Sequence, residues 1–413
     1  MICMIISAIN ISSDIFSFLN IESKIWGRKL HMVSTSNEKF ELTGLTKGKS
    51  IYDAVFITHS HSDHIGLINN INKDIPIFVE KESLKIHNLT CDFCNKEKVN
   101  RRINTFEIRD MDKKYNFDNR EIFNNGDISI SAYATDHSAF NSCMFLVEAD
   151  GKRLLHTGDF RTHGRRSELF KIALRKIGKV DMLITEGTTL TRYTKDECHI
   201  PREKELEEET YKIINKYSQV LVLQSSTNID RTVTFGRCAK KCDKKFILDL
   251  FSYYINEEST HFFDVDYKNV FVWLPKNYNK KPEWFKSKYL TIETSSKFGK
   301  KFVMEVKQSM IDDIKLLHKK GLLNNACLIY SMWDGYIEKE KALLEFLEEI
   351  KKLGIKVEKI HTSGHANISG MKLVNKILNP NQTIIIHTEN GKLGEEIFNN
   401  VVEINDNEYV DIK

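Results

Sequence analysis

The order of apolar and polar positions predicts short strands in the first half of the chain. Residues 51–58 are rich in β-forming side chains, and residues 128–135 alternate apolar and polar positions as a half-buried strand does. The other strands expected in this half are residues 75–79, 143–148, 153–156 and 180–185. An Asp150-Gly151 pair separates two of them and is a strong signal for a hairpin turn.

The pattern changes in the second half, where helical periodicity alternates with apolar strands. A charged amphipathic helix is expected over residues 202–216. The further strands are residues 219–223, 245–250, 270–274, 326–332, 356–360 and 383–386, and the further helices are residues 229–241 and 337–352. This alternation is typical of a parallel α/β layer.

Composition indicates an ordinary globular protein. Of the 413 residues, 41% are hydrophobic and 29% are charged, and the length allows two domains or one domain with a large insertion. The net charge of +4 is too small for a general attraction to polyanions, so a nucleic-acid partner needs a local basic groove. Because the chain has no run of about 18 apolar residues and no basic leading segment, we expect neither a membrane span nor a signal peptide.

Eight cysteines are spread along the chain, which favours reduced thiols in a cytoplasmic protein. Cys91 and Cys94 have the spacing of a zinc knuckle, and Cys238 and Cys242 lie four residues apart on a predicted helix. A structural zinc site requires the two pairs to meet in space. The sequence leaves this open, and free thiols are the favoured interpretation.

The sequence His59-Ser-His61-Ser-Asp63-His64 concentrates metal ligands at the end of a predicted strand. Packed histidines usually occur singly, each with its own partner, so this density indicates chemistry. Residues two apart in a loop can project to one side. His59 and His61 are therefore expected to hold one metal ion, and Asp63 and His64 a second. The cluster predicts a two-metal hydrolase.

Three later residues are candidates for completing the two metal sites. His137 is a candidate third nitrogen for the first ion, Asp159 a bridge between both ions, and His387 a ligand of the second. Each of them follows a predicted strand, where open α/β and sandwich folds place their functional loops.

These residues resemble the signature motifs of the metallo-β-lactamase superfamily. The cluster from His59 to His64 resembles its first motif. Asp136-His137 and His156-Thr-Gly-Asp159 resemble its third and fourth motifs. The resemblance implies an α/β fold, an αββα metallo-β-lactamase sandwich, that binds two Zn²⁺ ions, with Mn²⁺ as the alternative.

Three further residues resemble the β-CASP branch, whose nucleases include ribonuclease J and the cleavage factor of messenger-RNA 3′-end processing. Glu186 resembles its motif A acid, His365 in Ser363-Gly-His365-Ala its motif B histidine, and His387 its motif C. The resemblance implies an inserted α/β β-CASP domain. We therefore expect a metallo-β-lactamase domain in residues 1–200 and 356–413, with a β-CASP domain in residues 201–355.

The start of the chain departs from the family pattern. Residues 1–50 do not show the usual opening strands with an Asp-Gly motif, and Ser34-Thr-Ser36 is not a convincing substitute. In the family, the Asp of this motif contacts the metal ligands rather than the metal ions. The sequence therefore offers no counterpart of that Asp in residues 1–50.

The resemblance implies a metal-dependent phosphodiesterase that hydrolyses RNA with a hydroxide activated by two metal ions. Asp63, Glu186 and His365 are the expected catalytic residues, with His365 as the acid and Glu186 orienting it. A histidine at motif C is typical of RNA-acting members, which favours RNA. Gly158-Asp159-Phe-Arg161 resembles DNA-acting enzymes, so a DNA nuclease is one alternative. A small-molecule ester, thioester or lactone hydrolase is another, although those enzymes lack the insertion.

Substrate contacts are expected mainly from the inserted segment. Ser225, Ser226, Asn228 and Arg231 lie at a predicted strand-to-helix turn whose free N–H groups suit a phosphate, although a plain helix cap explains them equally well. The other candidate substrate-binding residues are His361 and Ser363. The expected partner is single-stranded RNA, without a membrane, and a homo-oligomer is left open.

Overall fold

The computed structural model describes residues 2–5, 18–23, 28–33, 44–50, 52–108, 120–192, 201–259, 270–274, 289–388, 390–404 and 408–412. The chain forms two compact units. The first unit consists of Met1–His199 and Gly364–Lys413, and the second of Ile200–Ser363. The second unit is therefore an insertion in the first. The chain returns to the first unit at Gly364, later than residue 356, where the sequence predicts the return.

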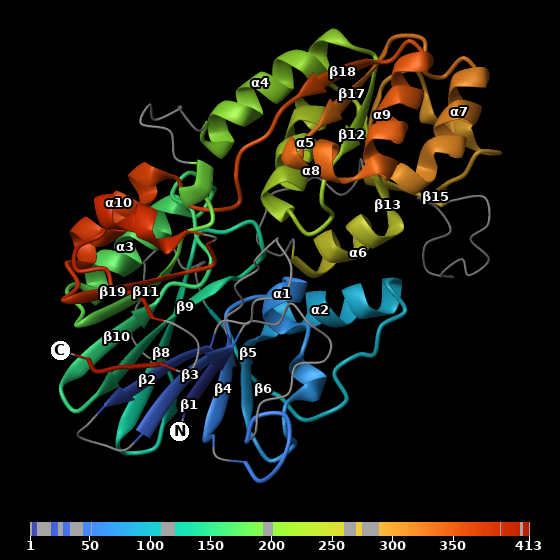
Figure 1. Ribbon diagram of the computed structural model, residues 1–413. Coiled ribbons are helices and arrows are strands. Elements are labelled where there is room, and N and C mark those ends of the chain that lie inside the picture. The colour runs from blue at the N-terminus through green and yellow to red at the C-terminus, as the bar shows by residue number, and fades with distance from the viewer. Residues whose placement is uncertain are drawn as a thin grey trace. The chain divides into compact units, whose positions relative to one another are not determined.

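The first unit contains two sheets (Figure 1). In spatial order, the first sheet holds β20 (Glu408–Val410), β2 (Phe18–Ser23), β3 (Arg28–Val33), β1 (Ile2–Ile5), β4 (Ala54–Ile57), β5 (Ile77–Glu80) and β6 (Asn104–Phe106). The second sheet holds β19 (Gln382–Ile386), β11 (Met182–Glu186), β10 (Lys152–His156), β9 (Cys143–Ala149), β8 (Ile128–Ala134) and β7 (Glu121–Asn124). β9 and β10 pair antiparallel around the predicted hairpin turn, while β10, β11 and β19 run parallel.

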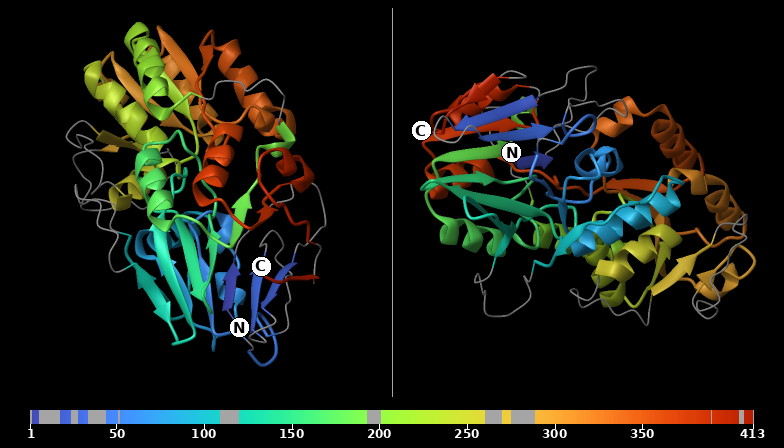
Figure 2. Two further views of the ribbon diagram at one scale, coloured as in Figure 1. Left: turned by 90° about the vertical axis from the view of Figure 1, so that its left-hand side faces the viewer. Right: turned by 90° about the horizontal axis from the view of Figure 1, so that it is seen from below.

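The two sheets pack face to face through one apolar cluster. Phe56 of β4 contacts Phe145 of β9 with ring centroids 5.8 Å apart, and side chains of β8, β10, β11 and β19 join them. The outer face of the second sheet is covered by α3 (Ser167–Ile177) and α10 (Ile368–Leu378), which lie side by side (Figures 1 and 2).

The outer face of the first sheet carries three helical segments that pack on it through apolar residues. They are α1 (Ser62–Ile65), the 3-10 turn η1 (Ile68–Asn70) and α2 (Lys81–Phe93). Helix, sheet, sheet and helix layers follow one another, so the predicted αββα sandwich is confirmed.

The second unit is built around one parallel sheet. Its strands in spatial order are β15 (Tyr289–Leu290), β14 (Val270–Trp273), β13 (Lys245–Asp249), β16 (Phe302–Val306), β12 (Gln219–Leu223), β17 (Ala326–Tyr330) and β18 (Lys356–Lys359). Its helices are α4 (Glu203–Lys216), α5 (Ile229–Lys241), α6 (Leu250–Ser259), α7 (Ile311–Lys319), α8 (Gly335–Lys339) and α9 (Lys341–Lys352).

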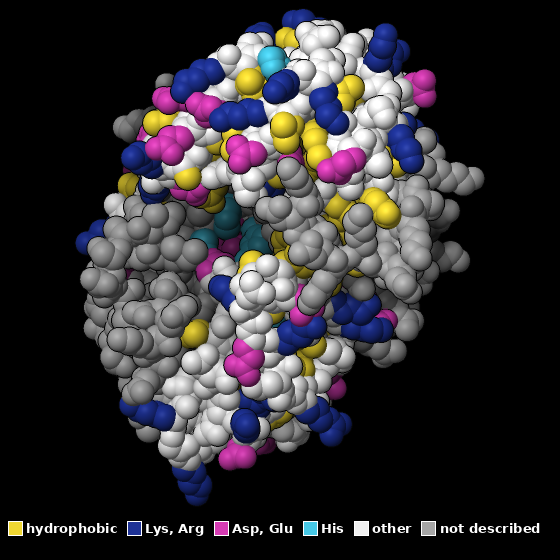
Figure 3. Space-filling view, turned by 90° about the vertical axis from the view of Figure 1, so that its right-hand side faces the viewer, with side chains coloured by type: hydrophobic (Ala, Val, Ile, Leu, Met, Phe, Trp, Pro, Cys, Tyr) yellow, Lys and Arg dark blue, Asp and Glu magenta, His cyan; other side chains and the backbone are white. Residues whose placement is uncertain are grey.

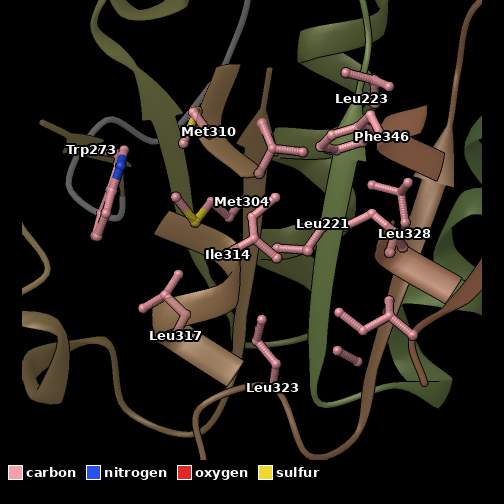
Figure 4. Close-up of a cluster of buried hydrophobic side chains, with 14 of the residues drawn as sticks. Leu221, Leu223, Trp273, Met304, Met310, Ile314, Leu317, Leu323, Leu328 and Phe346 are labelled. Carbon is pink, nitrogen blue, oxygen red and sulfur yellow. The ribbon is translucent and has the colours of Figure 1, made fainter. Parts of the chain in front are cut away.

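Helices cover both faces of this sheet, as expected for a parallel layer. On one face Ile314 of α7 and Phe346 of α9 pack with Leu221, Met304 and Leu328 of the strands (Figure 4). On the other face a second cluster joins α4, α5 and α6 to the sheet. The described part of the chain also contains the 3-10 turns η2 (Leu190–Arg192), η6 (Ser295–Phe298), η7 (Gln308–Met310) and η8 (Gly391–Glu396).

Two expectations about elements are wrong. The helix expected over 337–352 is two helices, α8 and α9, because Glu340 between them has an extended backbone with φ −111° and ψ 99°. Residues 1–50 do contain opening strands, β1 to β3, and the residues of Ser34-Thr-Ser36 lie outside the described part of the chain. In the described part, no helix is long and apolar enough to cross a membrane.

Candidate metal centre

The histidine cluster lies where β4 runs into the short helix α1. β4 ends at Ile57, and His61 is the N-cap of α1 with an extended backbone of φ −63° and ψ 145°. The turn from strand to helix brings the side chains of the cluster inward, and His59 and His64 are fully buried. Several histidine side chains gather beside acidic side chains on the face shown in Figure 3.

The first group of donor atoms consists of three imidazole nitrogens. The ligand atoms of His59, His61 and His137 all lie within 4.8 Å of one another. Nε2 of His59 is 3.1 Å from Nδ1 of His61, which is 3.3 Å from Nε2 of His137. Burial is the main cause that lowers the pKa of His59 and His137 well below the ordinary value, and that of His61 to about 4. At neutral pH these imidazoles are therefore uncharged.

The tautomer of His137 follows from its second nitrogen. Nδ1 of His137 lies 2.7 Å from the carbonyl oxygen of Gly364, which only accepts a hydrogen bond, so Nδ1 carries the proton. The neutral ring then has its lone pair on Nε2, facing His61. This contact also links the loop after β8 to the segment where the chain re-enters the first unit.

The second group of donor atoms consists of Asp63, His64 and His387. Oδ2 of Asp63 lies 3.6 Å from Nε2 of both histidines. Burial alone would raise the pKa of Asp63, but the neighbouring His64 and His387 hold it below its ordinary range. His387 follows β19 with φ +55°, a conformation that non-glycine residues rarely adopt and that is often found at functional sites.

Asp159 lies between the two groups. Its Oδ2 atom is 3.1 Å from Nε2 of His64, 3.8 Å from that of His59, and 3.9 Å from those of His137 and His387. Burial alone would raise the pKa of Asp159, but electrostatic attraction to the His387 and His64 imidazoles lowers it well below its ordinary value. The carboxylate is therefore ionised.

This donor set fits divalent metal ions. Neutral imidazoles and ionised carboxylates are the ligands that zinc and manganese take in proteins. The buried Nε2 atom of His387 has no hydrogen-bond partner among the described residues. An ion at each group would use the lone pairs that otherwise face one another. The His and Asp clusters therefore indicate metal binding.

Glu186 and His365 lie beside the second group. Glu186 ends β11, and its Oε1 accepts hydrogen bonds from the backbone N–H of Phe160 at 2.8 Å and of Ala366 at 3.3 Å. Its Oε2 lies 3.0 Å from Nδ1 of His365. Burial alone would lower the pKa of His365, but the carboxylates of Glu186 and Asp159 together raise it above its ordinary value.

Two threonines that sequence reasoning missed support the histidines. Oγ1 of Thr58 lies 3.1 Å from Nδ1 of His59 and 3.2 Å from Nδ1 of His64. Oγ1 of Thr188 lies 2.6 Å from Nδ1 of His387. A threonine at a strand end is an ordinary residue, so the only available signal was that each stands next to a motif, in Thr58-His59 and in Glu186-Gly-Thr188.

The expected phosphate-binding turn lies in the second unit, between β12 and α5. Ser225 is exposed, Ser226 is buried and accepts a hydrogen bond from Ser252 at 2.9 Å, and the side chain of Asn228 caps α5 by accepting from the N–H of Arg231 at 3.3 Å. The cap interpretation that the sequence left open therefore applies to Asn228.

Arg231 does not present its guanidinium to solvent. It is fully buried, with Nε 3.0 Å from Glu203 and Nη1 bonded to Ser331. This is a structural ion pair, which corrects the expectation that Arg231 grips phosphate. His361 and Ser363 are half-buried, and burial lowers the pKa of His361 to about 4.

The cysteine pairs show no sign of a zinc knuckle. Cys91 and Cys94 belong to the first unit and Cys238 and Cys242 to the second, and none of the four forms a disulfide within the described residues. Within the described residues, none of the clusters suited to a metal ion contains a cysteine.

Part of the chain matches a known protein family. The family profile described as a β-lactamase superfamily domain matches residues 40–219. The chain is similar to ribonuclease J 2 of Streptococcus pyogenes, with 24% identity over 193 residues that cover 45% of this chain and 32% of that relative. The match thus spans about a third of the relative's length.

The fold is also similar to the crystal structure of a protein of unknown function from Enterococcus faecalis, with a TM-score of 0.70 and 19% identity, covering 89% of this chain and 83% of that one. The matched domain and the His and Asp clusters support a metal-dependent hydrolase. Residues 40–219 therefore match a β-lactamase superfamily domain, and the weak homology to ribonuclease J supports the β-CASP nuclease branch of the metallo-β-lactamase superfamily.

Proposed function

We propose that this protein is a two-metal phosphodiesterase that hydrolyses RNA. The observation that carries the proposal is the position of Asp159, whose Oδ2 lies within 3.9 Å of nitrogens from both donor groups. A carboxylate in that position suits a bridge between two ions. The matched domain and the ligand clusters by themselves support a metal-dependent hydrolase, without naming its substrate.

In this proposal His59, His61 and His137 would hold the first ion, and Asp63, His64 and His387 would hold the second. The carboxylate of Asp159 would reach both. Bound divalent ions supply Lewis-acid chemistry, because they lower the pKa of water and neutralise charge on phosphate oxygens. The ions are zinc in our proposal, with manganese as the alternative, since both accept this mixture of nitrogen and oxygen ligands.

His365 is the proposed general acid for the leaving oxygen. Glu186 keeps the proton of His365 on Nδ1 through the 3.0 Å contact and favours the charged ring. The Nε2–H of that charged ring is then available to the leaving group. The carboxylate of Glu186 is itself fixed by the backbone N–H groups of Phe160 and Ala366.

RNA is preferred as the substrate on two grounds. The curated relative is named a ribonuclease, and His387 stands where RNA-acting members of the family carry histidine. Ser225, Ser226, His361 and Ser363 stay candidates for contacts to the RNA backbone. Arg231 is not among them, because its guanidinium is committed to Glu203.

The test is cleavage of 5′-labelled RNA and of DNA of matched sequence. We compare the zinc-loaded wild type with Asp63→Ala, and with Asp53→Ala as the control at the other, exposed end of β4. Wild type and Asp53→Ala should cleave RNA. Asp63→Ala should be slower by on the order of 100-fold or more, because one ion loses its carboxylate.

The other outcomes discriminate among the alternatives. Cleavage of DNA alone would assign a DNA nuclease. Intact RNA together with hydrolysis of a thioester or lactone would assign a small-molecule hydrolase. Equal RNA cleavage by wild type and Asp63→Ala would contradict the two-metal mechanism.

A further inference from the structure

One hydroxyl group lies among three groups of the candidate site. Oγ1 of Thr188 is 2.5 Å from Oε2 of Glu186, 2.6 Å from Nδ1 of His387 and 3.2 Å from Nδ1 of His365. Thr188 is brought there by parallel pairing of β11 with β19, in which Glu186 stands opposite Ile386, the residue before His387. The backbone N–H of Gly187 extends this pairing by donating to the carbonyl of Ile386 at 2.8 Å.

The positions of the protons follow from these distances. A carboxylate oxygen accepts hydrogen bonds only, so the proton of the Thr188 hydroxyl points to Glu186. If the hydroxyl donated to His387 instead, the two oxygen atoms 2.5 Å apart would face each other without a proton. The hydroxyl therefore uses a lone pair towards His387, and Nδ1 of His387 carries a proton.

This arrangement sets which nitrogen His387 presents. With its proton on Nδ1, the neutral ring has its lone pair on Nε2, the atom 3.6 Å from Asp63 and 3.9 Å from Asp159. The left-handed backbone at His387, with φ +55°, is unfavourable by itself and needs contacts that hold it. The hydrogen bond to Thr188 is such a contact.

We propose that Thr188 is a positioning residue that fixes the tautomer and orientation of His387 for the ion held with Asp63 and His64. The inference rests on the proposed function and adds a chain of contacts to it. Glu186 orients His365 directly and orients His387 through the hydroxyl of Thr188. Partners behind a metal-binding histidine typically contribute 10–100-fold to metal affinity.

The first experiment measures zinc affinity of the full chain by competition with a chromophoric chelator. Wild type should bind two equivalents. Thr188→Val should weaken one of them by about 10–100-fold and leave the other unchanged, whereas Thr188→Ser keeps both. Thr185→Val is the matched control, because Thr185 is also buried on β11, and its hydroxyl accepts a hydrogen bond from Thr157 at 3.3 Å, away from the histidines.

The second measurement does not depend on a variant of Thr188. In zinc-loaded wild type labelled with ¹⁵N-histidine, the ring of His387 should show a protonated Nδ1 and a metal-bound Nε2, assigned by comparison with His387→Gln. Coordination through Nδ1 would overturn the role of Thr188, whether or not Thr188→Val folds.

The results separate the two proposals. A wild type that binds no metal would overturn the proposed function. A wild type that binds two ions, with Thr188→Val unchanged or with both ions weakened equally, would overturn only the assignment of Thr188 to His387.

Discussion

Nδ1 of His365 lies 3.0 Å from Oε2 of Glu186, across a separation of 179 residues in sequence. The carboxylate raises the pKa of this histidine against the effect of burial. A general acid must keep its proton until the leaving group departs, and the raised pKa of His365 favours this.

Glu186→Gln should therefore slow RNA cleavage by about 100-fold or more, since general acid catalysis typically contributes 10²–10⁴-fold. The same variant should lose much less activity on bis(4-nitrophenyl) phosphate, whose leaving group needs no proton. Initial rates on both substrates give the comparison. Equal losses on the two substrates would argue against His365 as the acid, and zinc content serves as the control.

Gly158 directly precedes Asp159 in its loop and has a backbone conformation that suits glycine. Its φ is +58°, and an added Cβ would lie 2.8 Å from the carbonyl oxygen of Cys143. Gly158→Ala should destabilise the protein by about 1–3 kcal/mol beyond the control, since backbone atoms cannot move aside cheaply. Gly151→Ala is that control, because it has φ +72° with open space around it. Urea denaturation compares the two, and equal losses would contradict the close packing at Gly158.

Arg231 and Glu203 form a buried ion pair in the second unit, with exposed fractions of 0% and 1% for their side chains. Arg231→Ala leaves the Glu203 carboxylate buried without its cation, which should cost about 3–5 kcal/mol in the free energy of unfolding. A phosphate contact would behave differently. It would weaken RNA binding and leave the urea midpoint unchanged.

Glu305 is fully buried in β16, and burial raises its pKa from 4.5 to about 6 against the attraction of Lys307. The nearby Asp249 acts in the same direction as burial. The folded state binds the proton of Glu305 more tightly than the unfolded state does. Protonated Glu305 therefore contributes fully to stability below pH 4.5, and this contribution is lost as the pH rises through 6.

Glu305→Gln should therefore stabilise the protein at pH 8 by up to about 2 kcal/mol relative to wild type, and change little at pH 4.5. The glutamine oxygen can still accept the hydrogen bond from Gln224. Urea midpoints of both proteins at the two pH values provide the measurement. A stabilisation that is the same at both would mean that Glu305 does not titrate in this window.

The sequence predicted which His and Asp side chains cluster, because these residue types are uncommon and stand at strand ends. His59, His137 and Asp159 each follow a strand, and parallel or sandwiched strands bring such ends together. Supporting residues are harder to predict. Thr58 and Thr188 act through a hydroxyl whose partners are set by tertiary contacts, and such threonines occur throughout any sheet protein.

For Arg231 the sequence suggested a binding role that the tertiary contacts exclude. An arginine at a helix start favours phosphate binding on local grounds. Its partner Glu203 lies 28 residues earlier, on another helix, and only the packing of α4 against α5 makes the pair visible. The strands β1 to β3 were missed for a similar reason, because they are stabilised by pairing with distant strands such as β4 and β20.

The central claim is that two metal ions lie on either side of Asp159. Anomalous scattering from crystals of zinc-loaded protein, recorded above and below the zinc edge, tests this most directly. Two peaks are expected, one among His59, His61 and His137 and one among Asp63, His64 and His387, with Asp159 in contact with both. A single peak, or peaks away from these residues, would contradict it.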